Sequence, residues 1–308
     1  MKKWIPVIIL SAVLMGASAF WYYSRPYDPS RLMQMLPPDR SVHVYLNFAA
    51  LRSAGILDTI AGSKQVEAAD YKKFVDDTGF DYRKDLDSLA LAFRDGDVYF
   101  AAQGRFEWQK LAAYAPAHGG KCDQFLCTTP GTEPGRNVSY YMPRTGTLAM
   151  ATSRTATATD MVGPGTWAET PEIGDEGLWI QTPPSAFRDL SKMPAGTRSF
   201  FSPLADAGKT VFALGPASKG NGFELRMEVS TRDAAAAKKL AEQYQEVTAL
   251  LVKMLERDHM TPTPSDLTGV LVAGQFQSKD KYVLGTWPIS KAFLEALASS
   301  VDLGGAKQ

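Results

Sequence analysis

Beyond residue 36, short runs of alternating apolar and polar residues predict antiparallel strands. The first run places Val44 and Leu46 on one face and His43 and Tyr45 on the other, polar face, which is typical of a half-buried strand. Turns rich in glycine and polar residues then separate the strands of four predicted hairpins. The paired strands are Leu89–Phe93 with Val98–Gln103, Val138–Met142 with Thr147–Ala151, Thr210–Leu214 with Phe223–Val229, and Val270–Gln277 with Tyr282–Trp287.

Helical patterns follow the strands. One helix is predicted after the first strand, through Leu51, and a second from Ala68 to Thr78. Four more begin just after the second strands of the hairpins, near Phe106, Thr155, Arg232 and Ser290. The longest runs from Arg232 to Asp258, and its apolar stripe predicts packing against the sheet.

The order of these elements repeats after about half the chain, which indicates an internal duplication. The strand at Val42 has a counterpart at Leu178–Gln181, and the later hairpins and helices correspond in the same order. Each half follows the ferredoxin-like βαββαβ order, with a strand and a helix added. We therefore predict an α+β fold, in which an N-terminal transmembrane helix precedes two related modules of antiparallel sheet with helices on one face.

The pattern also predicts where these parts begin and end. A membrane segment at 1–23 and a tether at 24–35 precede a first module at 36–163. A linker at 164–177, rich in turn residues, leads to a second module at 178–300 and a disordered tail at 301–308.

The N-terminal segment predicts membrane attachment. Lys2 and Lys3 precede uncharged residues 4–23, which as a helix span about 30 Å, the thickness of a bilayer core. Positive charges favour a cytoplasmic N-terminus, so we expect a single-pass protein of the bacterial inner membrane with its body on the periplasmic, extracytoplasmic side. The alternative is secretion after cleavage at Ala19, because Ala17-Ser18-Ala19 fits a signal-peptidase site.

The two cysteines, Cys122 and Cys127, bear on the compartment. In an exported chain, cysteines so close together favour a local disulfide. Two free thiols, or a redox or metal role, are the alternatives, although the spacing is not Cys-x-x-Cys and no histidine lies at zinc-site spacing.

Charge excludes one class of partner. The chain has 33 basic and 33 acidic residues, and without Lys2 and Lys3 the balance is 31 against 33, a net charge of −2. Such a chain has no overall positive field, so we expect no nucleic-acid partner.

Candidate chemistry is sparse. His43, His118 and His259 are isolated in sequence, and no metal site is expected. The Gly215–Gly222 segment contains glycines but lies between predicted strands rather than before a helix, so it indicates a hairpin loop rather than a phosphate loop. The carboxylates Asp81, Asp85 and Asp87 lack the glycine and glutamate of a calcium loop and indicate a solvated turn. No catalytic residue and no cofactor are predicted.

The opening of the predicted body resembles a family of uncharacterised bacterial envelope proteins. The residues that carry the resemblance are Leu36-Pro37-Pro38-Asp39, Ala50-Leu51-Arg52 and Thr78-Gly79-Phe80-Asp81. The resemblance is confined mainly to the first half. It implies anchoring and export, and no activity.

Together these observations predict a membrane-anchored envelope protein, held by residues 4–23, with a non-catalytic binding or scaffolding role. Its partner would be an envelope protein or an apolar ligand. One alternative is a carrier of lipid or another apolar ligand that uses a cleft between the modules. Another is a hydrolase whose site, with carboxylates such as Asp81 or Asp85, forms only in three dimensions.

Overall fold

The computed structural model describes residues 28–300, except 39, 58–68, 164–166, 168–170, 192–197, 199 and 218–221. Within this part of the chain, no helix is long and apolar enough to cross a bilayer. The predicted anchor at 4–23 and tail at 301–308 lie outside the described residues.

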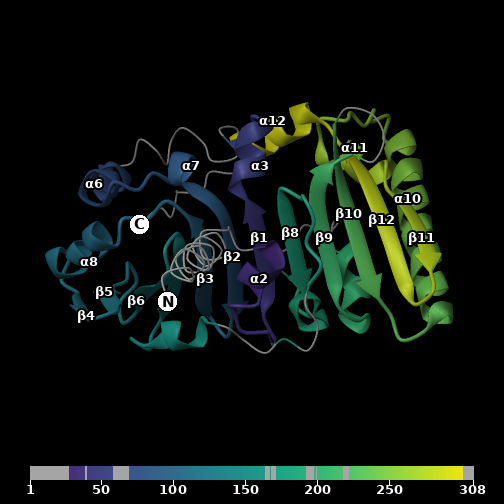
Figure 1. Ribbon diagram of the computed structural model, residues 1–308. Helices are drawn as coiled ribbons and strands as arrows, with labels where there is room; N and C mark the ends of the chain where they lie inside the picture. Colours follow the sequence, from purple (N-terminus) through teal and green to yellow (C-terminus); the bar gives the residue numbers. More distant parts are fainter. Residues whose placement is uncertain are drawn as a thin grey trace, which may run out of the picture.

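In the described residues, twelve strands form one antiparallel sheet in the order β11-β12-β10-β9-β8-β1-β2-β3-β7-β6-β5-β4 (Figure 1). The first half contributes β1 (Val42–Asn47), β2 (Leu86–Arg94), β3 (Asp97–Gly104), β4 (Lys121–Asp123), β5 (Leu126–Pro130), β6 (Asn137–Arg144) and β7 (Thr147–Ser153). The second half contributes β8 (Leu178–Thr182), β9 (Thr210–Pro216), β10 (Phe223–Ser230), β11 (Gln275–Lys279) and β12 (Tyr282–Ile289). The mixed α+β class with an antiparallel sheet agrees with the sequence prediction.

The two halves meet at the β1–β8 pair, where Tyr45 lies opposite Trp179. Outward from this pair, β2, β3, β7 and β6 follow in one direction and β9, β10, β12 and β11 in the other. This is the order that a duplication predicts, with β4 and β5 as additions to the first half. The duplication itself remains a prediction.

The ferredoxin-like arrangement is wrong for this sheet. In that arrangement another strand lies between the two strands that the first crossover helix connects, whereas here β1 pairs directly with β2. The reason lies in the connection after β1. Asn47 at the end of β1 lies opposite Ser88 near the start of β2, so the helices between them form an excursion at one end of the sheet instead of a crossover.

One row of cross-strand partners runs through eight strands on the back face of the sheet, the face away from the viewer in Figure 1. Directly opposed residues share a face, and this row is Leu148, Ala102, Leu89, Leu46, Leu178, Leu214, Leu225 and Trp287. The helices α6 (Ala69–Thr78), α8 (Trp108–Ala117) and α10 (Ala234–Arg257) contribute residues to the clusters on this face.

The front face of the first half is built from small residues that let a short helix approach closely. Its five fully buried alanines are Ala90, Ala92, Ala101, Ala149 and Ala151. Helix α2 (Pro29–Met33) lies against them (Figure 1), and its Leu32 and Met33 are 0% exposed. Trp167 and Ile173, in the predicted linker, join the same cluster. This described part of the linker therefore packs on the sheet.

Several local predictions differ from the structure. The segment predicted as a strand from Val270 begins as helix α11 (Leu267–Val272), because the Asp266 side chain caps it by accepting from Gly269 N at 2.6 Å. The helix predicted near Thr155 is a single 3₁₀ turn, η1 (Ala158–Met161), and a second such turn, η2 (Pro184–Phe187), follows β8. The remaining short elements are α3 (Phe48–Ser53), α7 (Tyr82–Asp85), η3 (Ser202–Asp206) and the C-terminal α12 (Lys291–Ser300).

His43 was predicted on the polar face of its strand, but it is 0% exposed. Its Nε2 lies 2.8 Å from Pro37 O, and its ring centroid lies 4.7 Å from that of Trp167. The alternating pattern failed here because α2 and the Trp167 segment cover the face of β1 that was predicted to be polar. Burial lowers the pKa of the imidazole, although the Pro37 hydrogen bond opposes this shift.

The seam between the halves should dominate stability. Trp179→Ala should lower the free energy of unfolding by about 3–5 kcal/mol, because it removes a large buried side chain that is 4% exposed. Urea unfolding would measure this. Phe125→Ala is the control, since Phe125 is 75% exposed and its loss should change stability by no more than about 0.5 kcal/mol. Equal effects of the two substitutions would contradict the prediction.

His43 should make stability depend on pH. Its pKa in the folded protein lies below the ordinary value of 6.5, so the unfolded chain binds the proton first as the pH falls. The contribution is therefore complete above about pH 6.5 and is lost as the pH falls through the folded pKa. Urea titrations of wild type and His43→Gln should show a smaller loss of stability on acidification in the variant. Parallel curves would exclude His43 as the cause.

Candidate functional site

An apolar cavity of ≈ 650 Å³ lies inside the first half, between the back face of the sheet and helices α6 and α8. The size falls within the roughly 300–1,000 Å³ typical of ligand pockets. Its lining residues are mainly aliphatic and aromatic, and charged side chains occur among them only at Glu133 and Arg136. The cavity is therefore suited to an apolar molecule with a small polar end.

The floor of the cavity consists of large apolar side chains that the protein itself only half covers. Leu89, Phe100, Leu148 and Met150 are half-buried, although they belong to inner strands of the sheet. Ala102, between Leu89 and Leu148 in the cross-strand row, is the small residue of this floor. The alanines on the opposite face are fully buried. The larger side chains thus point into the hollow and the smaller ones into the packed core.

Aromatic side chains from α6, α8 and the adjoining loops form the roof. The rings of Phe74 and Tyr114 meet edge to face at 5.3 Å, and those of Phe80 and Phe106 stack at 4.9 Å between centroids. Both arrangements are favourable for aromatic pairs. Tyr140 closes one side: its hydroxyl donates to Leu111 O at 2.8 Å, and burial raises its pKa to about 12. The walls are therefore held in place without a ligand.

The corresponding space in the second half is filled. Helix α10 has 24 residues and packs Leu240 and Tyr244 against the back face. The Tyr244 ring stacks on Phe276 at 4.8 Å, and Phe276 meets Trp287 at 5.2 Å. The Tyr244 hydroxyl donates to Phe200 O at 3.0 Å. The sheet therefore has one packed half and one hollow half.

The hollow follows from the position of α8. This helix has 10 residues and contains Pro116, which ends regular helical bonding. It contacts β4 and β5, the two strands without counterparts in the second half. Because the added hairpin holds α8 at the outer edge of the sheet, a hollow remains between this helix and the back face of β2, β3 and β7.

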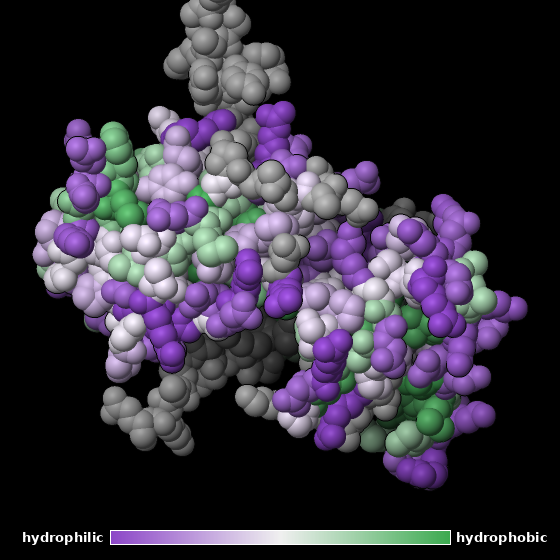
Figure 2. Space-filling model, turned by 90° about the horizontal axis from the view of Figure 1, so that it is seen from below, coloured by the Kyte–Doolittle hydropathy of each residue, from purple (hydrophilic) through white to green (hydrophobic). Residues whose placement is uncertain are grey.

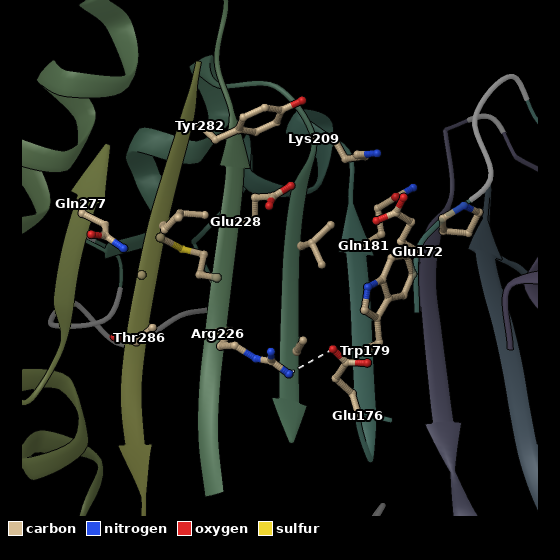
Figure 3. Close-up of a pocket in the computed structure, with 16 residues that line it drawn as sticks. Glu172, Glu176, Trp179, Gln181, Lys209, Arg226, Glu228, Gln277, Tyr282 and Thr286 are labelled. Carbon is tan, nitrogen blue, oxygen red and sulfur yellow. Dashed lines mark hydrogen bonds and ion pairs between the residues drawn. The ribbon is translucent and has the colours of Figure 1, made fainter. Parts of the chain in front are cut away.

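A second, polar hollow of ≈ 620 Å³ lies on the front face of the second half (Figure 3). Side chains from five strands point into it, including Gln181, Arg226, Glu228, Gln277 and Thr286. Arg226 Nη2 lies 3.0 Å from Glu176 Oε1. The surface seen from below is mostly polar, with apolar patches in both halves (Figure 2). This hollow is an open sheet face with mixed charges and is a weaker candidate than the apolar cavity.

Cys122 and Cys127 lie opposite each other in the β4–β5 hairpin and form a disulfide. Cys127 is 0% exposed and packs in the cluster of Leu111, Ala115 and Tyr140 beside the cavity. The disulfide therefore fixes the added hairpin on which α8 lies.

The carboxylates considered from the sequence have structural partners. Asp81 caps α7, and its Oδ1 accepts from Tyr71 Oη at 2.8 Å. Burial alone would raise the Asp81 pKa, but hydrogen bonds from Tyr71 and Arg83 N and the nearby Lys84 together lower it. Asp85 lies 3.0 Å from Arg105, and Asp87 lies 3.9 Å from Arg52. Asp85 Oδ2 also accepts from Asp81 N at 2.9 Å, so each of the three carboxylates has a structural role in a hydrogen bond or an ion pair.

The described lining residues of the cavity include none of the histidines and no residue of the glycine-rich segment, although the His118 ring stacks on Tyr114 of the roof. His118 Nδ1 lies 2.9 Å from Tyr114 O, and His259 adopts a positive φ of 53° just after α10. Gly215 and Pro216 are the last residues of β9, and residues 217–222 lead to β10. Among the described residues, no group of three or more histidine, cysteine, aspartate or glutamate side chains could hold a metal ion.

Comparison with known proteins adds little about function. No family model and no curated protein matches this chain. Solved structures of TP0453 are similar: crystal form I has 13% identity and a TM-score of 0.49, and crystal form III has 12% identity and a TM-score of 0.45. The matches cover 90% of this chain and 97% and 98% of those chains. This likeness is too distant to support a functional inference.

The disulfide should stabilise the hairpin modestly. Replacing both cysteines, Cys122→Ser with Cys127→Ser, should lower the free energy of unfolding by about 2 kcal/mol, because a bridge across so short a loop restricts the unfolded chain little. Urea unfolding without reductant would measure the difference. Reductant should bring the wild type to the same midpoint and leave the double variant unchanged. A wild-type midpoint that is insensitive to reductant would contradict the assignment.

Proposed function

We propose that this protein binds an apolar ligand, a molecule with a long alkyl chain, in the cavity between the first-half sheet and helices α6 and α8. The observation that carries the proposal is the contrast between the halves. In the second half Tyr244, Phe276 and Trp287 fill the space over the back face, whereas in the first half the same face borders a hollow of ≈ 650 Å³.

Physical cost supports this interpretation. Burying apolar surface stabilises a protein by about 25 cal/mol for each Å² removed from water. Apolar side chains that face an empty or water-filled hollow do not gain this stabilisation. An alkyl chain in contact with Leu89, Phe100, Leu148 and Met150 would bury their surface and gain this free energy. The walls are preformed by the ring contacts of Phe74 and Phe80, which limits the ordering cost of binding.

The location differs from the cleft between modules that the sequence suggested. The two halves are joined by strand pairing, with Leu46 opposite Leu178, and the apolar cavity lies within the first half. The proposal keeps the non-catalytic binding role. Membrane anchoring through residues 4–23 and a periplasmic location are also part of it, since an export segment would place the binding body near a source of lipid.

Filling the cavity should weaken binding. Ala102→Phe places a ring at the centre of the floor, so the full chain should bind a fluorescent dodecyl probe at least roughly tenfold more weakly, a loss of about 1.4 kcal/mol or more. Probe titration would measure the dissociation constant. Ala249→Phe adds the same ring on α10, where Ala249 is exposed, and should leave binding unchanged.

The thermal midpoint of each variant shows whether it folds. If Ala102→Phe is too unstable, Leu148→Trp enlarges a half-buried side chain of the same floor and serves in its place. Equal probe affinity in wild type and a folded cavity variant would refute the proposal.

A further inference from the structure

The only charged side chains among the described lining residues of the cavity lie together at one end. They are Glu133 and Arg136, in the loop between β5 and β6, accompanied by Thr129, Thr132 and Thr152. Glu133 is 74% exposed in its side chain, which places this end at the surface. The polar end of a bound amphiphile would meet these groups while its chain occupied the apolar part.

The positive charge at this end is already engaged. Arg136 Nε donates to Glu133 Oε2 at 3.0 Å, and Nη1 donates to Asp97 Oδ1 at 3.3 Å and to Thr152 O at 3.4 Å. Nη2 donates to Gly96 O. These bonds use four of the five N–H donors of a guanidinium group. One cation therefore faces two carboxylates and two carbonyl groups.

The negative charges are engaged as well. Asp97 accepts from Arg136 through Oδ1 and from Ser153 Oγ through Oδ2 at 2.8 Å. Glu133 accepts from Arg136. Among the described lining residues, an incoming carboxylate meets one cation that already serves two carboxylates, and an incoming ammonium would have to share Glu133 with Arg136. Either charge would lose hydration at the cavity without gaining an ion pair of its own, which is costly.

From this arrangement we propose that the ligand has a neutral, hydroxyl-bearing head group, as in a long-chain alcohol or an acylglycerol. A hydroxyl both donates and accepts hydrogen bonds, so it can donate to Glu133 and accept from a threonine hydroxyl without displacing Arg136. This inference rests on the proposed function and adds selectivity against anionic fatty acids and cationic amphiphiles.

Three photoreactive probes with the same dodecyl chain and diazirine position test it: the alcohol, the carboxylate and the ammonium. Each is irradiated with the full chain at about pH 8, where a carboxylic acid is ionised and an alkyl ammonium is largely protonated. Mass spectrometry then measures labelling of the peptide that contains Leu148 and Met150. The alcohol should label this peptide at least tenfold more than either charged probe at equal concentration.

Glu133→Gln provides the discriminating variant. Removing this exposed carboxylate frees one donor of Arg136, so labelling by the carboxylate probe should rise severalfold relative to the alcohol. Glu107→Gln is the matched control, because Glu107 is 62% exposed and pairs with Lys110, which does not line the cavity. It should leave the ratio unchanged.

The outcomes separate the two proposals. Absence of labelling in this peptide by all three probes would refute the binding function itself. Labelling by the carboxylate or the ammonium equal to that by the alcohol would overturn only the head-group inference. An alcohol preference that Glu133→Gln does not alter would overturn the assignment of selectivity to the Arg136 cluster.

Discussion

Antiparallel pairing of β1 with β8 is the interaction on which the rest of the structure depends. It makes one sheet from two halves, with Tyr45 opposite Trp179 and Leu46 opposite Leu178. Because strand residues alternate between faces, this register sets a continuous apolar row on the back face. A shift of one residue would turn leucines of one half toward the front. Every helix that packs behind the sheet relies on that alignment.

The back face of the sheet is covered differently in its two halves. In the second half, the long α10 fills the space with Tyr244 against Phe276. In the first half, an added hairpin moves the shorter α8 outward and leaves a hollow. A cavity of this kind can bind a ligand without any catalytic group. It requires only a scaffold firm enough to remain open, which the buried alanine face and α2 supply from the other side.

Much of the fold could be predicted from residue patterns, whereas the site could not. Alternation located the strands around Val44, Leu89 and Val211, and the long stripe of α10 identified the helix with the largest core contact. The β4–β5 hairpin was not predicted, because its strands are short and lie among glycine, proline and threonine residues. The burial of His43 depends on α2 and on Trp167, and Trp167 is remote in sequence. The cavity reflects a helix displaced by that unrecognised hairpin, and no local pattern encodes such a displacement.

The disulfide-linked hairpin also has a consequence for self-association. A long sheet ends in backbone groups that can pair with another chain and seed aggregation. Here the terminal strand β4 has three residues, all exposed, with Lys121 and Asp123 on either side of the bridged cysteine. So short and charged an edge offers a poor template for a further strand. The outermost element of the first half thus limits growth of the sheet from one molecule to the next.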